Sequence, residues 1–126
     1  MPSPATAAST VFALRIAYGA ALVLVPDRLT RRWLGPGGRT PPAQVALRGL
    51  GAREVVLHAG GLVAAARGGA VRPWLVASIA GDVVDIVATV AGRRGLPQHA
   101  APATAFVAGG SALLSAAVAV AVAADD

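Results

Sequence analysis

The sequence predicts an all-α membrane protein, in which the 126 residues form a single integral membrane domain folded as a four-transmembrane-helix bundle. The composition favours it, because hydrophobic residues make up 56% of the chain and charged residues only 13%, about half the charged share that is usual in soluble domains. The distribution favours it too, because four apolar runs are each long enough to cross a bilayer. These runs are residues 7–25, 45–66, 73–92 and 102–124.

Prolines and charges define the four runs. Pro26 closes the first run, Pro41 and Pro42 precede the second, and Pro73 opens the third in a position that proline favours. The fourth run contains no charged residue. A soluble helix needs a polar face, so this run argues against a soluble bundle. The amino terminus lacks the basic stretch of a signal peptide, and we expect the first run to be retained.

A short amphipathic segment follows the first run. Between Asp27 and Gly35, arginines alternate with Leu29, Trp33 and Leu34. This pattern predicts a short interfacial helix after the first span, anchored by its aromatic residue. The turn-rich linker GPGGRTPP comes next.

The loop arginines predict the orientation in the membrane. The first loop holds four arginines, the third holds two, the second holds two, and the termini hold none. The positive-inside rule places the first and third loops in the cytoplasm. We therefore expect a multi-pass protein of the cell membrane with both termini outside. In chain order the loop arginines are Arg28, Arg31, Arg32 and Arg39, then Arg67 and Arg72, then Arg93 and Arg94.

Composition also excludes several function classes. The chain has no cysteine, which rules out disulfides and thiol catalysis. All eleven basic residues are arginine, a bias typical of high-GC bacterial genomes. They lie in short loops or inside the apolar runs, without the polar surface of a nucleic-acid module. We expect membrane lipid to be a partner, no nucleic acid, no cofactor, and no metal site, because the chain offers too few oxygen, cysteine or histidine ligands.

Seven ionisable residues fall inside the apolar runs. Charges at membrane depth are costly, so they are candidates for function by default. One lies in the first run, four in the second and two in the third. They are Arg15, then Arg48, Arg53, Glu54 and His58, then Asp82 and Asp85.

Helical phase predicts which residues face the bundle interior. Arg53 is the exception in the second run: it lies about 100° from Glu54 around the helix and should meet a different neighbouring helix. The predicted interior faces are Arg15, Tyr18, Gly19 and Leu22; Arg48, Gly51, Glu54, His58, Gly61 and Ala65; Trp74, Ser78, Gly81, Asp82, Asp85 and Thr89; and Ala108, Ser111, Ala112 and Ser115. The predicted lipid face of the third run is Val76, Ile79, Val83, Ile86, Val87 and Val90.

Two interpretations of the intramembrane charges remain open. In the first, they neutralise one another and fix the pairing of the helices. In the second, they line a cavity in which a carboxylate exchanges protons. The candidate acid–base residues are Glu54, His58, Asp82 and Asp85. The candidate charge partners and pocket-lining residues are Arg15, Arg48, Arg53, Tyr18, Trp74 and Ser78.

A purely structural role would also explain several of the candidate site residues. His58 lies one turn after Glu54 and could relay a proton, but a hydrogen bond within the core would also explain it. Asp82 and Asp85 are three residues apart and suit a shared proton, or salt bridges to the arginines. Interfacial anchoring explains Trp74 equally well.

Three short patterns carry a family resemblance. They are R-x-x-G-x-R-E from Arg48 to Glu54, R-P-W-L followed by D-x-x-D from Arg72 to Asp85, and R-x-x-x-G from Arg15 with a later proline. Together they resemble a family of small bacterial four-helix membrane proteins of unknown function, distantly similar to DoxX-like proteins. The resemblance implies a four-helix bundle and supplies no established activity.

Three functions fit these observations. The first is a small membrane-embedded enzyme or binding protein that acts on a lipophilic small molecule by acid–base chemistry, as an isomerase or cyclase would. The second is a proton-coupled exporter, which would need a homodimer to enclose its path. The third is an accessory or scaffold subunit with purely structural ion pairs. An unpaired carboxylate beside a ligand-sized cavity would favour the first, a two-sided water path the second, and complete pairing without a cavity the third.

Overall fold

The computed structural model describes residues 1–125, and these residues form five α-helices joined by short turns. The all-α class predicted from the sequence is confirmed over this part of the chain. Each predicted run corresponds to one helix, whose ends lie within about four residues of the predicted ones. The elements are α1 (Pro4–Leu24), α2 (Pro26–Leu34), η1 (Gly35–Arg39), α3 (Pro41–Ala66), α4 (Arg72–Ala91), η2 (Arg93–Gly95) and α5 (Ala100–Asp125).

Three of the helices, α1, α4 and α5, are long and apolar enough to cross a membrane. This indicates a membrane protein. Helix α3 has sufficient length at 26 residues, but Arg48, Arg53 and Glu54 make it less apolar than the other three. Length and composition therefore do not identify α3 as a membrane-spanning helix, although the sequence analysis predicted a fourth span there.

Local sequence explains where the helices begin and end. The Ser3 hydroxyl oxygen accepts the amide hydrogen of Thr6 at 3.2 Å and caps α1, which satisfies one of the donors that a helix start leaves free. Proline occupies the first turn of α1, α2, α3 and α4. Gly35, with φ of 62°, ends α2 in a left-handed conformation that glycine adopts without strain. The predicted interfacial segment is thus observed as a helix, α2.

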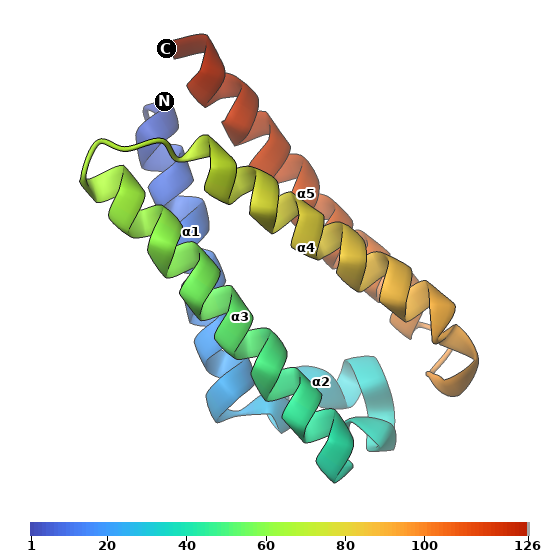
Figure 1. The fold of residues 1–126 in the computed structure, drawn as a ribbon. Coiled ribbons are helices and arrows are strands. Elements are labelled where there is room, and N and C mark those ends of the chain that lie inside the picture. Colours follow the sequence, from blue (N-terminus) through green and yellow to red (C-terminus); the bar gives the residue numbers. More distant parts are fainter. Residues whose placement is uncertain (126) are drawn as a thin grey trace.

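The four long helices form two closely packed pairs, α1 with α3 and α4 with α5. Sparser contacts join the two pairs, between α1 and α5 and between α3 and α4. Figure 1 shows the amino and carboxyl termini at the same end of the bundle, with α2 at the opposite end. The bundle is therefore two consecutive halves of the chain placed side by side.

Glycines allow α1 and α3 to approach closely. A Cβ atom on Gly19 would lie 2.6 Å from the carbonyl oxygen of Gly51, and one on Gly51 would lie 2.8 Å from the Cβ atom of Leu22. Such separations are shorter than real side chains tolerate. Small residues at helix crossings are typical of membrane bundles, where packing replaces the hydrophobic effect between helices.

At the end that carries the termini, an apolar cluster joins the two pairs. Phe12 of α1 and Leu75 of α4 are fully buried in it. Phe12 also packs its ring against the backbone at Gly61 of α3. The buried members are Ala8, Val11, Phe12, Val71, Leu75, Val118 and Ala119. The cluster does not extend to the middle of the bundle, where the buried side chains are polar.

The predicted lipid face of α4 is partly confirmed. Val76, Val83, Val87 and Val90 are exposed, as a lipid-facing stripe requires. Ile79 and Ile86 are half-buried instead, so that part of the prediction was wrong. A Cβ on Gly109 of α5 would meet the Cδ1 atom of Ile86 at 4.0 Å, because α5 packs against this side of α4.

We expect Gly51→Ala to destabilise the protein clearly, because the added methyl group would force α1 away from α3. Gly49 is the matched control, since it lies in the same helix and a Cβ there meets nothing within 4 Å. Gly49→Ala should be neutral or stabilising by up to about 1 kcal/mol, because alanine favours the helix more than glycine. Thermal unfolding in detergent, followed by tryptophan fluorescence, compares the two variants. Equal melting temperatures would contradict the close helix crossing.

Candidate functional site

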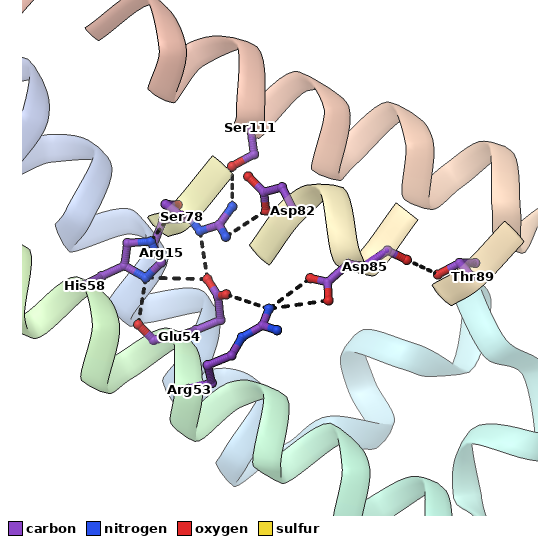
Figure 2. A network of polar contacts seen from close by, with 9 residues as sticks. All are labelled: Arg15, Arg53, Glu54, His58, Ser78, Asp82, Asp85, Thr89 and Ser111. Carbon is purple, nitrogen blue, oxygen red and sulfur yellow. Dashed lines mark hydrogen bonds and ion pairs between the residues drawn. The ribbon is translucent and has the colours of Figure 1, made fainter. Parts of the chain in front are cut away.

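Arg15 of α1 lies at the centre of a polar network that joins four helices. Its Nε atom donates to Glu54 Oε2 of α3 at 2.8 Å, and its Nη2 atom donates to Asp82 Oδ1 of α4 at 2.8 Å. Its Nη1 atom donates to the hydroxyl of Ser111 on α5. All three nitrogen atoms of the guanidinium group are therefore occupied, each by a different helix (Figure 2).

A second arginine extends the network toward the surface. Arg53 Nη2 donates to Asp85 Oδ2 at 3.1 Å and to Glu54 Oε1 at 3.3 Å. The sequence predicted that Arg53 and Glu54 contact different neighbouring helices. This is confirmed, because Arg53 pairs with Asp85 of α4, whereas Glu54 pairs with Arg15 of α1. The side chains of Arg53 and Asp85 are 40% and 30% exposed. This pair is consequently the outer edge of the network.

His58 continues the network toward the apolar cluster. Its Nδ1 atom lies 2.7 Å from the backbone oxygen of Glu54, and its Nε2 atom lies 2.9 Å from the hydroxyl of Ser78 on α4. The ring is completely buried and its centroid lies 6.1 Å from that of Phe12. Because a carbonyl oxygen can only accept, Nδ1 carries the hydrogen, and Nε2 can accept from Ser78. The bonding of His58 is therefore complete in the neutral form.

The network joins the two helix pairs with buried charge. The side chains of Glu54 and Asp82 are 2% and 3% exposed, and that of Arg15 is 14% exposed. Buried ions are tolerated only when they are paired and hydrogen-bonded, since desolvation otherwise dominates. The three contacts of Arg15 provide this compensation. The same contacts fix the position of the α1–α3 pair against the α4–α5 pair.

The structure brings together most of the predicted site residues. Arg15, Arg53, Glu54, Asp82 and Asp85 form the ion pairs. Ser111, which was predicted to lie on an interior face, contacts Arg15 of the charged core.

Two predicted residues lie elsewhere. Arg48 is exposed and makes no ion pair within residues 1–125. Six residues separate it from Glu54, which places it about 120° away around a helix of 3.6 residues per turn. Leu47, seven residues before Glu54, occupies the buried face instead. Trp74 packs its ring against Gly60 beside the apolar cluster, away from the charges.

A cavity of about 400 Å³ adjoins the network on the side of α2. This volume lies in the range of small-molecule sites, about 300–1,000 Å³. Its wall is largely apolar, and the charged side chains gather in one part of it. The lining residues are Arg15, Tyr18, Leu22, Leu29, Thr30, Trp33, Leu50, Glu54, Asp82, Asp85, Ala103, Thr104, Val107, Ala108 and Ser111. Tyr18 lines the cavity, whereas His58, Ser78 and Trp74 do not.

No protein family, curated protein or solved structure matches this chain.

Sequence reasoning missed the contribution of α2 to the cavity. Trp33 Nε1 donates to Thr104 Oγ1 of α5 at 2.8 Å, which holds α2 against the second helix pair. Leu29 and Thr30 of the same helix also line the cavity. The amphipathic pattern of α2 predicted a membrane surface as the partner of its apolar face. Part of that face covers the cavity instead.

One oxygen in the charged network has no partner. Among the described residues, Asp82 Oδ2 and Ser115 Oγ are the buried side-chain polar atoms without a hydrogen bond. Figure 2 shows the other oxygen of Asp82 directed at Arg15. A buried acceptor without a donor costs about 1–3 kcal/mol. Asp82 is therefore the member of the network whose bonding is incomplete, and it lies on the cavity wall.

Within residues 1–125, no group of three or more His, Asp or Glu side chains is arranged to hold a metal ion. The three carboxylates of the network bond to arginines. The chemistry that these residues offer is proton transfer and the binding of polar groups in an apolar surrounding.

Proposed function

We propose that the chain is a four-span integral membrane protein that binds a lipophilic small molecule in the cavity and acts on it by acid–base chemistry. The observation that carries this proposal is the incompletely bonded carboxylate of Asp82 on the wall of a ligand-sized cavity. A purely structural charge cluster would be expected to satisfy each of its atoms and to leave no cavity.

Helix α3 is the proposed fourth span. Its 26 residues are sufficient in length, and it runs alongside α1 for much of its course (Figure 1). Its charges lower its hydropathy, but Glu54 and Arg53 are bonded to neighbouring helices. Charged residues inside a membrane bundle commonly face its interior in this way.

The wall of the cavity suits a lipophilic molecule. Leu22, Leu29, Leu50 and Val107 provide apolar surface from four different helices, while the ionisable groups lie together. A ligand of this type would enter from the bilayer, in which it is concentrated. Its apolar body would replace lipid against the leucines, and its polar group would meet the charged part of the wall.

Asp82 is the residue that we assign to proton transfer. Glu54 accepts from two arginines, and both nitrogen atoms of His58 are bonded away from the cavity. Asp82 retains one free oxygen, so it can give or take a proton without breaking its bond to Arg15. Arg15 would hold a negative charge that develops nearby. An isomerisation or cyclisation requires only such proton transfers in a water-poor site.

Binding can be tested through Trp33, which lines the cavity. The chain has two tryptophans, so Trp74→Phe leaves Trp33 as the single reporter. We expect a brominated neutral alcohol of lipophilic character to quench Trp33 fluorescence saturably in neutral detergent. Heavy-atom quenching requires contact, and occupancy of a finite site saturates.

A matched pair of variants on α5 separates the cavity from the lipid surface. Ala103→Phe places a ring on the cavity wall and should abolish saturable quenching. Leu113→Phe changes a residue that is 74% exposed and does not line the cavity, and it should leave quenching unchanged. Quenching that rises linearly and equally in all variants would reject the binding site.

The orientation inferred from the loop arginines is part of the proposal. Because the chain has no native cysteine, single cysteines report their own position. A cysteine at Ser3 should react with a membrane-impermeant maleimide in intact cells, and one at Gly37 should not. Both positions are exposed, so poor access within the fold would not explain a difference. Labelling at Gly37 alone would reverse the orientation.

A further inference from the structure

We propose that the ligand of this cavity carries a protonated amine, so that the site selects lipophilic monocations and binds their ammonium group at Asp82. This inference rests on the proposed binding function and specifies its ligand class. Two independent features of the wall support it: its charge and its unpaired oxygen.

The charged groups on the wall are predominantly acidic. Arg15 is the single basic residue among the lining residues, whereas Glu54, Asp82 and Asp85 are all carboxylates. Including Arg53, which pairs with the outer carboxylate, the network holds two cations against three anions. A net negative charge is unfavourable in a membrane interior. A bound monocation would balance it.

The unpaired oxygen indicates where the cation would bind. Asp82 is 2% exposed, and its Oδ2 atom has no hydrogen-bond partner. The atom is buried, and no protein group donates to it. Asp82 is part of the cavity wall, so an ammonium group on a bound ligand would supply the donor that this oxygen lacks. A charge-assisted bond from an ammonium group is about twice as strong as a neutral one.

Three probes with one skeleton test the ligand class. Adamantane bearing an aminomethyl, a hydroxymethyl or a carboxymethyl group differs essentially in the charge of its polar end. Each competes with the brominated alcohol for the Trp33 site of the full-length Trp74→Phe protein in nanodiscs of zwitterionic lipid. Affinity is taken relative to Ala103→Phe, which corrects for unequal partition into lipid. We expect the amine to bind at least 10-fold more tightly than the alcohol.

Variants of the carboxylates locate the selectivity. Asp82→Asn keeps an oxygen that can accept from Arg15, so the fold should survive, and binding of the alcohol by this variant verifies that it does. The amine should lose its 10-fold advantage in Asp82→Asn. Asp27→Asn, which removes an exposed carboxylate bonded to Gln44, should retain it. If Asp82→Asn does not fold, loss of the advantage in Asp85→Asn supports an acidic site, and an unchanged advantage overturns it.

The outcomes separate this inference from the proposed function. Equal binding of amine and alcohol, or preference for the carboxylate, would overturn the cationic ligand while leaving the binding site intact. An advantage of the amine that persists in Asp82→Asn would overturn the assignment to that residue. If none of the three probes competes in a manner that depends on Ala103, the proposed function fails together with the inference.

Discussion

Replacing Arg15 by methionine is expected to destabilise the protein more than any other single substitution in the charged network. The change leaves Glu54 and Asp82 buried without their main cation, and it removes the donor to Ser111. Breaking a buried ion pair from one side costs about 3–5 kcal/mol, against a total stability of about 5–15 kcal/mol for a typical domain. The melting temperature in detergent should fall by roughly 10–20 °C.

Arg48→Met is the matched control for this substitution. It removes the same charge from α3, but Arg48 is exposed and has no ion-pair partner among residues 1–125. Its effect on melting should be within about 0.5 kcal/mol. Adding Glu54→Gln and Asp82→Asn to Arg15→Met should restore part of the lost stability, because no charge then remains unpaired. Equal melting of the two single variants would show that Arg15 does not hold the bundle together.

The second large effect is expected from Glu54→Gln. Glu54 is 2% exposed and its two oxygens accept from Arg15 and Arg53. Glutamine supplies only one acceptor oxygen, and its amide group would point a hydrogen at one of these guanidinium groups. We expect a loss of about 2–4 kcal/mol, since a buried cation loses its counter-charge. Unfolding in detergent, followed through Trp33 and Trp74, measures it.

Asp85→Asn provides the comparison for Glu54→Gln. The Asp85 side chain is 30% exposed and pairs with an arginine that is 40% exposed, so solvent and headgroups screen the interaction. Its loss should cost less than about 1 kcal/mol. If Glu54→Gln melts like the parent protein, Glu54 is not a structural anion. It would then become the stronger candidate for the proton-transferring residue.

Helical periodicity predicted the inner positions of the network correctly. Glu54 and His58 lie four residues apart on α3, and Ser78 and Asp82 lie four apart on α4, and all four are buried. The rule failed at Arg48, because steps of three residues drift by about 60° each around the helix. Two such steps separate Arg48 from Glu54 and carry it out of the interior. Side-chain phase therefore has to be followed by the angle between residues, because Leu47, seven residues before Glu54, returns to the buried face.

The cavity could not be predicted in the same way. It depends on the angle between the two helix pairs and on the position of α2, which tertiary contacts such as the bond from Trp33 to Thr104 determine. Periodicity describes one helix at a time and contains no information about how far apart two helices lie. The unpaired oxygen of Asp82 could not be predicted either, because the sequence gives the number of carboxylates but not which of their oxygen atoms accept a hydrogen bond.

The division of the bundle into consecutive halves bears on how the protein is assembled in the membrane. The half that leaves the ribosome first, through α3, contributes Arg15, Arg53 and Glu54 to the network and has an excess positive charge there. The half that follows contributes Asp82 and Asp85 and is negative. The network charges of the two halves therefore have opposite sign, and the halves attract each other. Separately expressed halves, divided in the turn after α3, should accordingly co-purify from one membrane.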